Sequence, residues 1–367
     1  MAKPIPWGII ELSKLYWEFE GITMEDKVTI NDVAKLAGVS KSTVSRYLNK
    51  GYISTEKQER VRAAIAETGF KSNFFAKRLK TKESKLIGIV LPRMDSVSVG
   101  KLLSGFARIF EPAGYQQLLL VSGLDGKKEL QNMESLLQQG VDGIIVDSVG
   151  ITKKHKALAK SSGLPMVITG QSAEGLECIK IDDYGAGHMM GAYLRSLGHR
   201  RAVFAGVTET DTAVGVERRQ GFVDGFAKGE PKALVDFVQT GFDFLSAYNK
   251  AADILSYKPS VIVGATDNIS LGILRCLHER GIKVPQEISV AGFGGYDVGA
   301  VVYPALTTIF FDYELVGMKA AQFLLDKLSG KSREENLDMP LLFVERESVR
   351  NLTKGTNGEK MGFQSMV

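Results

Sequence analysis

The sequence predicts an α/β protein: an N-terminal all-α helix-turn-helix unit, followed by a two-lobed body built on doubly wound parallel sheets. Residues 28–49 contain two short helical patterns joined at a glycine. From residue 86 onward, apolar runs alternate with amphipathic helical stretches, which is typical of parallel strands covered by helices on both faces. There are eight such runs, which is many for one sheet, so we expect two lobes with a cleft between them. The expected strands are residues 86–91, 116–121, 142–146, 165–169, 201–206, 234–238, 260–265 and 288–293, and the expected helices between them include 101–110, 184–197, 215–228 and 269–280.

The first helix is predicted from its two ends. Thr29 is a good N-cap, and Asp32 lies three residues on, where a carboxylate meets free amide groups and the positive end of the helix. Gly38 supplies the left-handed conformation that ends the helix. The expected apolar face consists of Val33, Leu36 and Ala37.

The second helix is expected to start after Ser40 and to pack against the first helix through Val44 and Leu48. Its outward side chains are polar and basic, and a helix-turn-helix presents such a face to the major groove of DNA. A polar face that is only solvated is the alternative. The candidate DNA contacts in this region are Thr29, Lys41, Ser42, Thr43, Ser45, Arg46 and Asn49.

A third helix is expected over residues 56–67, opened by Thr55 and Gln58 at the spacing of a capping box. Its apolar residues would close a three-helix head. The head and the segment after it are basic. Residues 28–85 have a formal net charge of +8, whereas the whole chain of 367 residues has a formal net charge of +4. The rest of the chain has a formal net charge of −4, and a basic unit on a slightly acidic body suits a nucleic-acid-binding head on a ligand-binding body.

The segment after the head is basic and contains one leucine. Asn73 can cap a short helix from Phe74 to about Lys80, which would be marginal alone in water. One interpretation is a flexible basic linker. The other is a helix that orders on DNA, with its basic side chains on phosphates and Leu79 as an apolar wedge in the minor groove. The candidate DNA contacts here are Lys77, Arg78 and Leu79.

Other features of the sequence argue against a disulfide, a membrane span and a signal peptide. Cys178 and Cys276 are far apart in sequence, so we expect two free thiols in a reducing cytoplasm rather than a disulfide. No apolar run is long enough to span a membrane. Residues 1–27 lack the apolar core of a signal peptide, so we interpret them as a loosely ordered extension, with Met24 as a candidate natural start. The polar tail, residues 351–367, is expected to lack fixed structure.

Enzyme interpretations find little support. The phosphate-binding pattern GxxxxGK and the nucleophile pattern GxSxG are both absent, and the four histidines have no metal-ligand spacing. We therefore expect no catalytic activity, metal or cofactor. A solute-binding protein that does not regulate DNA is the stronger alternative, because the body alone could be one.

Several stretches match the sequence signatures of one family: VTINDVAKLAGVSKSTVSRYLN, KSNFFAKRLKTKESKLIGIV, IDDYGAGHMMGAYLRSLGHRRAVFAG, VPQEISVAGF and YPALTTI. They resemble the lactose/galactose repressor (LacI/GalR) family of bacterial transcription regulators. Within it, LPRMDS and TAVGVERR look more like the sucrose and trehalose repressors. The resemblance implies a DNA-binding head over residues 28–72, a hinge helix over 73–84 with Leu79 as its wedge, and a periplasmic-binding-protein-like effector and dimerisation domain over 85–350.

The resemblance further implies a cytoplasmic homodimer that represses transcription from operator DNA and responds to a sugar or sugar phosphate. It assigns the ligand-gripping arginine to Arg218 and the ligand-stacking aromatic residue to Phe242. Arg219 and Phe244 are the neighbouring alternatives.

Other effector contacts are predicted from strand ends, because ligands of parallel α/β sheets bind beyond the carboxyl ends of the strands. Polar side chains there suit a ligand rich in hydroxyl groups. Asp267 and Ser96 could instead only cap the helices that follow them. The candidates are Arg93, Asp95, Ser96, Ser98, Asp147, Gln171, Thr266, Asp267 and Gly294.

Two positions depart from the family pattern. Gly170 and Gly294 stand where many relatives have an aspartate, so we expect a more positive cleft. Two arginines in one cleft, Arg93 and Arg218, would repel each other unless an anion lay between them, which favours a phosphorylated sugar. The alternative is that Arg93 pairs with a nearby aspartate and does not meet the ligand.

Overall fold

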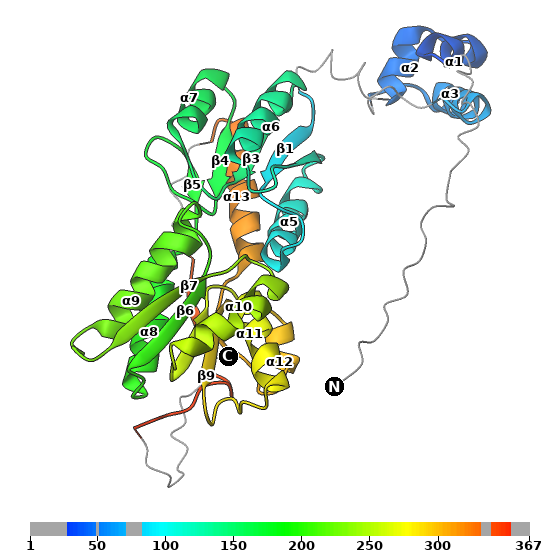
Figure 1. Cartoon of the computed structure of the whole chain (residues 1–367). Helices are drawn as coiled ribbons and strands as arrows, with labels where there is room; N and C mark the ends of the chain where they lie inside the picture. The colour runs from blue at the N-terminus through cyan, green and yellow to red at the C-terminus, as the bar shows by residue number, and fades with distance from the viewer. Residues whose placement is uncertain (1–27, 49–50, 71–82, 332–338, 354–367) are drawn as a thin grey trace, which may run out of the picture. The chain divides into compact units, whose positions relative to one another are not determined.

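The computed structural model describes residues 28–48, 51–70, 83–331 and 339–353. The chain divides into two units, Met1–Lys82 and Glu83–Val367, each with its own core (Figure 1). Four predicted DNA contacts lie outside the described residues, as does most of the predicted hinge helix: Asn49, Lys77, Arg78 and Leu79.

The described part of the first unit consists of helices α1 (Ile30–Ala37), α2 (Lys41–Leu48) and α3 (Thr55–Thr68). The ends of α1 are as expected. The backbone N–H and the hydroxyl of Thr29 donate to the Asp32 carboxylate at 2.8 and 2.6 Å, and Gly38 has a φ of 60°. The core consists of Val33, Ala34, Ala37, Val44, Val61 and Ala64.

Two details of this unit differ from expectation. Leu36 is 48% exposed, and Ala34 is buried instead. The buried face of α1 is formed by Val33, Ala34 and Ala37, and its centre lies roughly a third of a helical turn around the axis from Leu36. Helix α3 begins after Ser54, one residue earlier than expected. The Gln58 side chain does not complete a capping box, because it donates instead to the carbonyl of Ile53 at 3.1 Å.

Within the described part of the body, the first lobe is built on a five-stranded parallel sheet of order β2-β1-β3-β4-β5. Its strands are β1 (Leu86–Leu91), β2 (Gln116–Val121), β3 (Gly143–Asp147), β4 (Met166–Thr169) and β5 (Cys178–Ile179). Helices cover both faces (Figure 1). They are α5 (Val97–Phe110) and α13 (Tyr313–Leu328) on one face, and α6 (Gly126–Gln138) and α7 (Lys153–Ser162) on the other.

The second lobe has the described strand order β11-β10-β9-β8-β6-β7, with only β11 antiparallel to its neighbour. Its strands are β6 (Arg201–Gly206), β7 (Leu234–Gln239), β8 (Val261–Gly264), β9 (Ser289–Gly294), β10 (Thr307–Phe310) and β11 (Leu342–Val344). Helices α8 (Asp183–Ser196) and α9 (Arg219–Ala227) pack together, as do α10 (Phe244–Ser256) and α11 (Asp267–Glu279). The π-helix η2 (Thr212–Arg218) precedes α9, and α12 (Val298–Val301) follows β9.

The two-lobed, doubly wound architecture confirms the predicted fold class. The eight predicted strands are present, with ends that shift by one residue at most. Three described strands were not predicted, β5, β10 and β11, because runs of two to four residues carry little periodicity. The predicted helix over residues 215–228 is instead η2 followed by α9.

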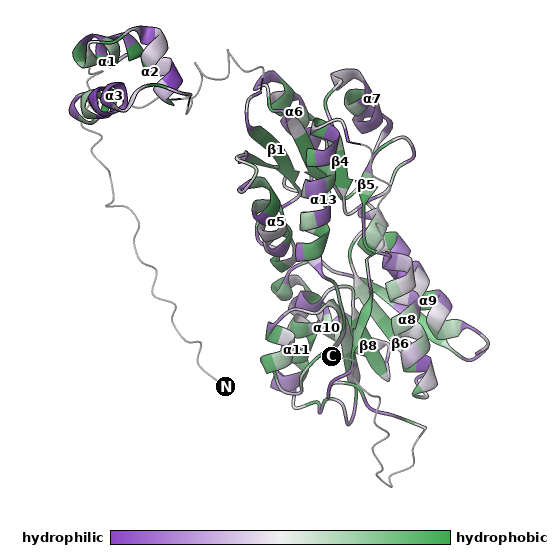
Figure 2. Cartoon of the chain, turned by 180° about the vertical axis from the view of Figure 1, so that it is seen from behind, coloured by the Kyte–Doolittle hydropathy of each residue, from purple (hydrophilic) through white to green (hydrophobic). Residues whose placement is uncertain are grey.

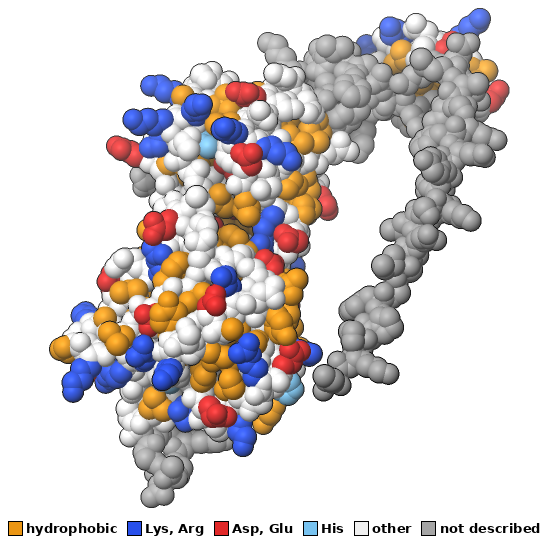
Figure 3. Space-filling model, in the orientation of Figure 1, with side chains coloured by type: hydrophobic (Ala, Val, Ile, Leu, Met, Phe, Trp, Pro, Cys, Tyr) orange, Lys and Arg blue, Asp and Glu red, His pale blue; other side chains and the backbone are white. Residues whose placement is uncertain are grey.

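Apolar side chains concentrate in the strands and on the inner faces of the helices, while hydrophilic residues face outward (Figure 2). Basic side chains gather on the outer surface near α7, where Lys153, Lys154 and Lys160 are exposed (Figure 3). Among the described residues, no helix is both long and apolar enough to cross a membrane.

Candidate nucleic-acid interface and effector cavity

The outer face of α2 carries the predicted base-reading side chains. Lys41, Ser42 and Arg46 are exposed, while Thr43 and Ser45 are half-buried. The first turn of α2 contains no acidic residue, so its free amide groups and Lys41 form a positive helix end. This end and the exposed side chains fit a groove lined by phosphates.

Two of the predicted DNA contacts also have structural roles. The Thr29 hydroxyl donates to Asp32 at the start of α1, and the Thr43 hydroxyl lies 2.9 Å from the hydroxyl of Ser40 at the start of α2. These hydroxyls help to fix the ends of the two helices. Lys41 and Arg46 are therefore better candidates for direct contact with bases.

A cavity lies between the two lobes of the body, at the carboxyl ends of several strands. This is where the strand-end argument placed a ligand site. Eight of the predicted effector contacts line it: Arg93, Ser96, Ser98, Asp147, Gln171, Arg218, Phe242 and Thr266.

Three predicted effector contacts do not line the cavity. Asp95 is exposed and forms an ion pair with Arg93 at 3.4 Å. Asp267 is fully buried, and its carboxylate accepts from the backbone N–H of Tyr296 and the hydroxyl of Thr308, at 2.8 and 2.7 Å. Gly294 lies in β9, where a Cβ would meet the Tyr296 ring at 2.7 Å. Asp267 is therefore structural, but it does not cap α11 as its alternative interpretation had it, because the N-cap is Thr266, whose hydroxyl accepts the backbone N–H of Ile269 at 3.4 Å.

Arg218 lies at the boundary between the cavity and the core, and only 3% of it is exposed. Its Nε donates to the Asp183 carboxylate at 2.8 Å, and its Nη2 contacts the same oxygen. Its Nη1 donates to the carbonyl of Ala265 at 2.6 Å, and the Phe311 ring lies 4.9 Å away. Burial opposes the charge, but Asp183, Tyr313 and Asp211 together outweigh it, so the pKa of Arg218 is raised.

Two further carboxyl groups line the cavity without a cation bound to them among the described residues. Burial raises the pKa of Asp147 to about 6, although the Thr169 hydroxyl donates to it at 2.9 Å. Burial also raises the pKa of Asp211 to about 6, against a hydrogen bond from the backbone N–H of Val214. Near neutral pH both groups are largely ionised acceptors, which suits hydroxyl groups of a ligand.

The positive side chains of the cavity are matched by acidic ones, so the argument that its two arginines need an anion between them does not apply. Asp183 and Asp211 line the cavity beside Asp147, and together they match the positive side chains Arg93, Lys180 and Arg218 in number. The sequence argument missed Asp183 because it follows a strand of only two residues. It missed Asp211 because that residue is the N-cap of a π-helix. The paired acids in IDD and the second acid in ETDT were the available signals.

The absence of an aspartate at Gly170 has a backbone cause. Gly170 has a φ of 78°, a region that residues with a Cβ rarely adopt. A Cβ there would also lie 3.2 Å from the Asp147 carboxylate. An aspartate at this position would therefore be strained and would face a like charge.

Contacts from both lobes meet around the cavity. The Arg93 guanidinium, at the end of β1, lies 4.8 Å from the centre of the Phe242 ring in the second lobe. Lys180 pairs with Glu217 of η2 at 2.7 Å. The backbone N–H of Thr212 donates to the carbonyl of Val149 at 3.1 Å. Each of these contacts depends on the distance between the lobes, so a ligand in the cavity can change them.

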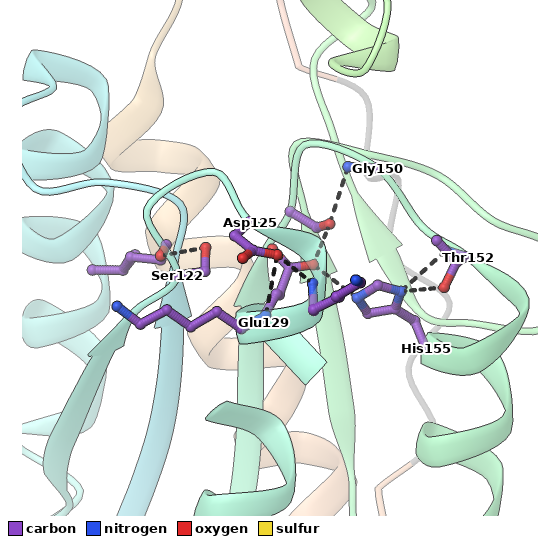
Figure 4. Close-up of polar contacts among 10 residues, drawn as sticks. Ser122, Asp125, Glu129, Gly150, Thr152 and His155 are labelled. Carbon is purple, nitrogen blue, oxygen red and sulfur yellow. Dashed lines mark hydrogen bonds and ion pairs between the residues drawn. The ribbon is translucent and has the colours of Figure 1, made fainter. Parts of the chain in front are cut away.

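The loop after β3 is held by a buried polar network (Figure 4). The Ser148 hydroxyl donates to Glu129 at 2.7 Å, and His155 Nε2 lies 3.0 Å from the same carboxylate. The backbone N–H of Thr152 donates to His155 Nδ1 at 3.1 Å, so Nδ1 is the acceptor and the ring proton is on Nε2. This network fixes the loop that carries the carbonyl of Val149 to the second lobe.

A helix-turn-helix unit on the same chain as a two-lobed body with a cavity between its lobes defines a ligand-controlled DNA-binding protein. Residues 29–73 match the model for bacterial regulatory proteins of the lacI family, and residues 192–349 match a periplasmic binding protein-like domain. The sucrose operon repressor of Staphylococcus xylosus is 33% identical over 88% of this chain and 99% of its own length. The transcriptional regulator TreR of Salmonella typhimurium is 28% identical over 86% of this chain and 99% of its own length.

Solved structures show the same fold. The lac repressor dimer bound to operator and the anti-inducer ONPF superposes with a TM-score of 0.81 at 23% identity, over 89% of this chain and 100% of that one. A complex of the transcriptional regulator CelR with cellobiose superposes with a TM-score of 0.64 at 25% identity, over 88% of this chain and 99% of that one. The chain belongs to the lacI family of bacterial regulatory proteins and is a DNA-binding transcriptional repressor.

Proposed function

We propose that this repressor is controlled by a small neutral sugar bound between the lobes of its body, and that it acts as a cytoplasmic homodimer on operator DNA. The observation that carries the effector proposal is the pair of cavity carboxyl groups, Asp147 and Asp211, with no cation bound to them among the described residues. A phosphate group beside them would meet two like charges, whereas sugar hydroxyls donate to them.

The rest of the cavity supports a sugar. Apolar side chains line it beside the polar groups, which is typical of sites that bind small ligands. The ring of Phe242 is among them and offers a face for a sugar ring. The relatives point the same way, since one is a sucrose operon repressor and another was solved with cellobiose.

A phosphorylated sugar is the second candidate, because of Arg93. Its Nε faces Asp95 at 3.4 Å, but neither terminal nitrogen has a hydrogen-bond partner within the described part of the chain. Arg218 and Lys180, in contrast, are already bonded to carboxylates. Arg93 is therefore the residue to which a phosphate on the ligand would bind.

DNA binding is proposed to use the exposed face of α2, with Lys41, Ser42 and Arg46 on base edges. One three-helix head covers a single half-site, so a two-fold operator needs two copies of the chain. The lac repressor structure contains such a dimer on its operator. The proposed roles of Lys77, Arg78 and Leu79 concern residues outside the described part of the chain.

Calorimetry with matched ligands tests the effector proposal. We expect sucrose, or another neutral disaccharide, to bind more tightly than its phosphate, and Arg93→Gln to leave that order unchanged. If the phosphate binds more tightly and Arg93→Gln abolishes its advantage, the second candidate is correct. If neither class binds, the cavity does not take a sugar. Recovery of the bound sugar unchanged would exclude the alternative that the body is an enzyme.

A further inference from the structure

The body begins with an unusual backbone conformation at Lys85. This residue has a φ of 53°, in the left-handed region that side chains with a Cβ rarely adopt. Glu83 is the first residue described after the 71–82 gap, so Lys85 lies where the chain enters the body after the helix-turn-helix unit in sequence. A disfavoured conformation persists only where its surroundings hold it in place.

Asp142 holds this conformation. Its Oδ1 accepts the backbone N–H of Ser84 at 2.7 Å, and its Oδ2 accepts that of Lys85 at 2.8 Å. Its own backbone N–H donates to the carbonyl of Leu86 at 2.8 Å. A carboxylate that receives two N–H groups makes strong, directional bonds. We call this arrangement the junction clamp, consisting of Asp142 and residues 84–86.

The Lys85 side chain makes further, weaker contacts at the junction clamp. The Lys85 ammonium pairs with Glu83 at 2.9 Å and lies 4.4 Å from the centre of the Tyr115 ring. Both contacts are at the surface, where ion pairs contribute little. The two backbone hydrogen bonds to Asp142 are therefore the main restraint.

The strand that follows Asp142 connects the junction clamp to the cavity. Strand β3 begins at Gly143 and ends at Asp147, and it pairs with both β1 and β4 in the middle of the sheet. Residues 143–146 are buried, and Asp147 and Ser148 line the cavity. A short strand packed on both faces moves as a unit, so a displacement at its cavity end also moves Asp142.

We infer that Asp142 is a positioning residue for DNA binding: it sets the direction in which the chain leaves the body toward the helix-turn-helix unit, and passes a shift of β3 to that point. The positioning role of Asp142 rests only on the DNA-binding function of the chain. Its role in passing on a shift of β3 rests on the proposed effector, and the experiment separates the two roles.

The experiment uses the full chain and a DNA duplex that the parent protein selects from a random pool. Asp142→Asn keeps the shape but replaces one acceptor with a donor. We expect it to weaken duplex binding about tenfold or more in the absence of any sugar. Asp125→Asn is the matched control, because Asp125 also accepts two backbone N–H groups, at the start of α6. We expect the control to change binding less than about twofold.

Two substitutions at Lys85 test the backbone directly. Lys85→Gly keeps the N–H and adopts a φ of 53° without strain, so we expect it to bind the duplex like the parent. Lys85→Pro removes the N–H and fixes a negative φ, so we expect it to weaken binding as Asp142→Asn does. This pair keeps the inference testable if Asp142→Asn does not fold.

Addition of sucrose tests the second role. If sucrose changes the parent's duplex affinity, we expect a smaller change for Asp142→Asn and an undiminished change for Asp125→Asn. An equal response in all three proteins would overturn the coupling role. If no protein responds to sucrose, the effector proposal fails for that sugar, and the sugar-free result still decides the positioning role. Parent-like, sugar-free binding by folded Asp142→Asn, or by folded Lys85→Pro, would overturn the whole inference.

Discussion

Arg218 is a fully charged side chain placed almost entirely out of water. It is stable there because the Asp183 carboxylate, the carbonyl of Ala265 and an aromatic ring replace the water that it loses. Its neighbour Arg219 provides a contrast, since it pairs with the exposed Glu209 near the surface. Two adjacent arginines thus have very different energetic roles.

Replacing these two arginines should separate those roles. Arg218→Met would leave the Asp183 carboxylate buried without its partner, so we expect the free energy of unfolding to fall by about 3–5 kcal/mol. Arg219→Met should cost only about 1 kcal/mol, because Arg219 is half-buried, its partner Glu209 is exposed, and methionine can keep contact with the Phe237 ring. Urea denaturation of the two variants measures both values. Similar losses for the two would mean that the buried pair is not a structural element of the cavity wall.

On α2, Arg46 is proposed to read a base. Arg46→Ala should cost about 1–3 kcal/mol of binding and relax the preference at one base pair. Arg62→Ala is the control, because Arg62 is an equally exposed arginine on α3 rather than α2. It should leave the preference intact. Selection of binding sites by each variant measures this, and an unchanged preference in Arg46→Ala would remove Arg46 from the base-reading face.

The C-terminal segment of the second lobe is attached through His199, just before β6. Its Nε2 donates to the carbonyl of Arg350 at 3.1 Å, and its Nδ1 lies 2.9 Å from the Ser260 hydroxyl. Burial lowers the pKa of His199 to about 4. The expected polar tail thus begins later than residue 351, since the backbone N–H of Leu352 still donates to Leu197.

This histidine makes stability depend on pH. Its folded pKa, about 4, is below its unfolded value of about 6.5, so its contribution is complete above pH 6.5 and is lost as pH falls toward 4. Asp147, Asp211 and Asp267 act in the opposite direction. Their folded pKa values are raised to about 6, so their contribution is complete below about pH 4 and is lost as pH rises through 6.

Comparison of the parent with His199→Gln isolates the histidine, because the three carboxyl groups are common to both proteins. The difference in unfolding free energy should be largest above pH 6.5 and shrink by up to about 3 kcal/mol as pH falls to 4. Denaturation at several pH values measures it. A difference that stays constant with pH would show that His199 does not titrate as the structure implies.

The long elements could be predicted from sequence because their signal is local. Strands β1, β2 and β6 are six-residue segments in which apolar residues dominate, and their ends are as predicted. The same rule located Arg93, Asp147 and Gln171, since each lies at or just after the end of a readable strand. Strand β5 is too short to be recognised, so Asp183 beyond it was missed. Arg218 was assigned by resemblance, because no local pattern shows that a helical arginine is buried.

At the scale of the whole molecule, the two units differ in their charge. The basic head suits DNA phosphates, whereas the cavity of the body balances three acidic against three basic side chains. Contacts that join the lobes, such as Arg93 on Phe242 and Lys180 with Glu217, are partly exposed to solvent. Replacing such contacts by contacts to a ligand costs little free energy. A repressor that is controlled by a ligand requires this.

The central claim is that one chain joins sequence-specific DNA binding to a sugar cavity. The most direct measurement is a titration of the selected DNA duplex with the full chain, with and without the sugar that binds in calorimetry. We predict that the sugar changes the duplex affinity by about 5–150-fold, as expected for coupled sites. We also predict that this change disappears in Asp147→Asn, which retains duplex binding. An affinity that is the same with and without a sugar known to occupy the cavity would contradict the account.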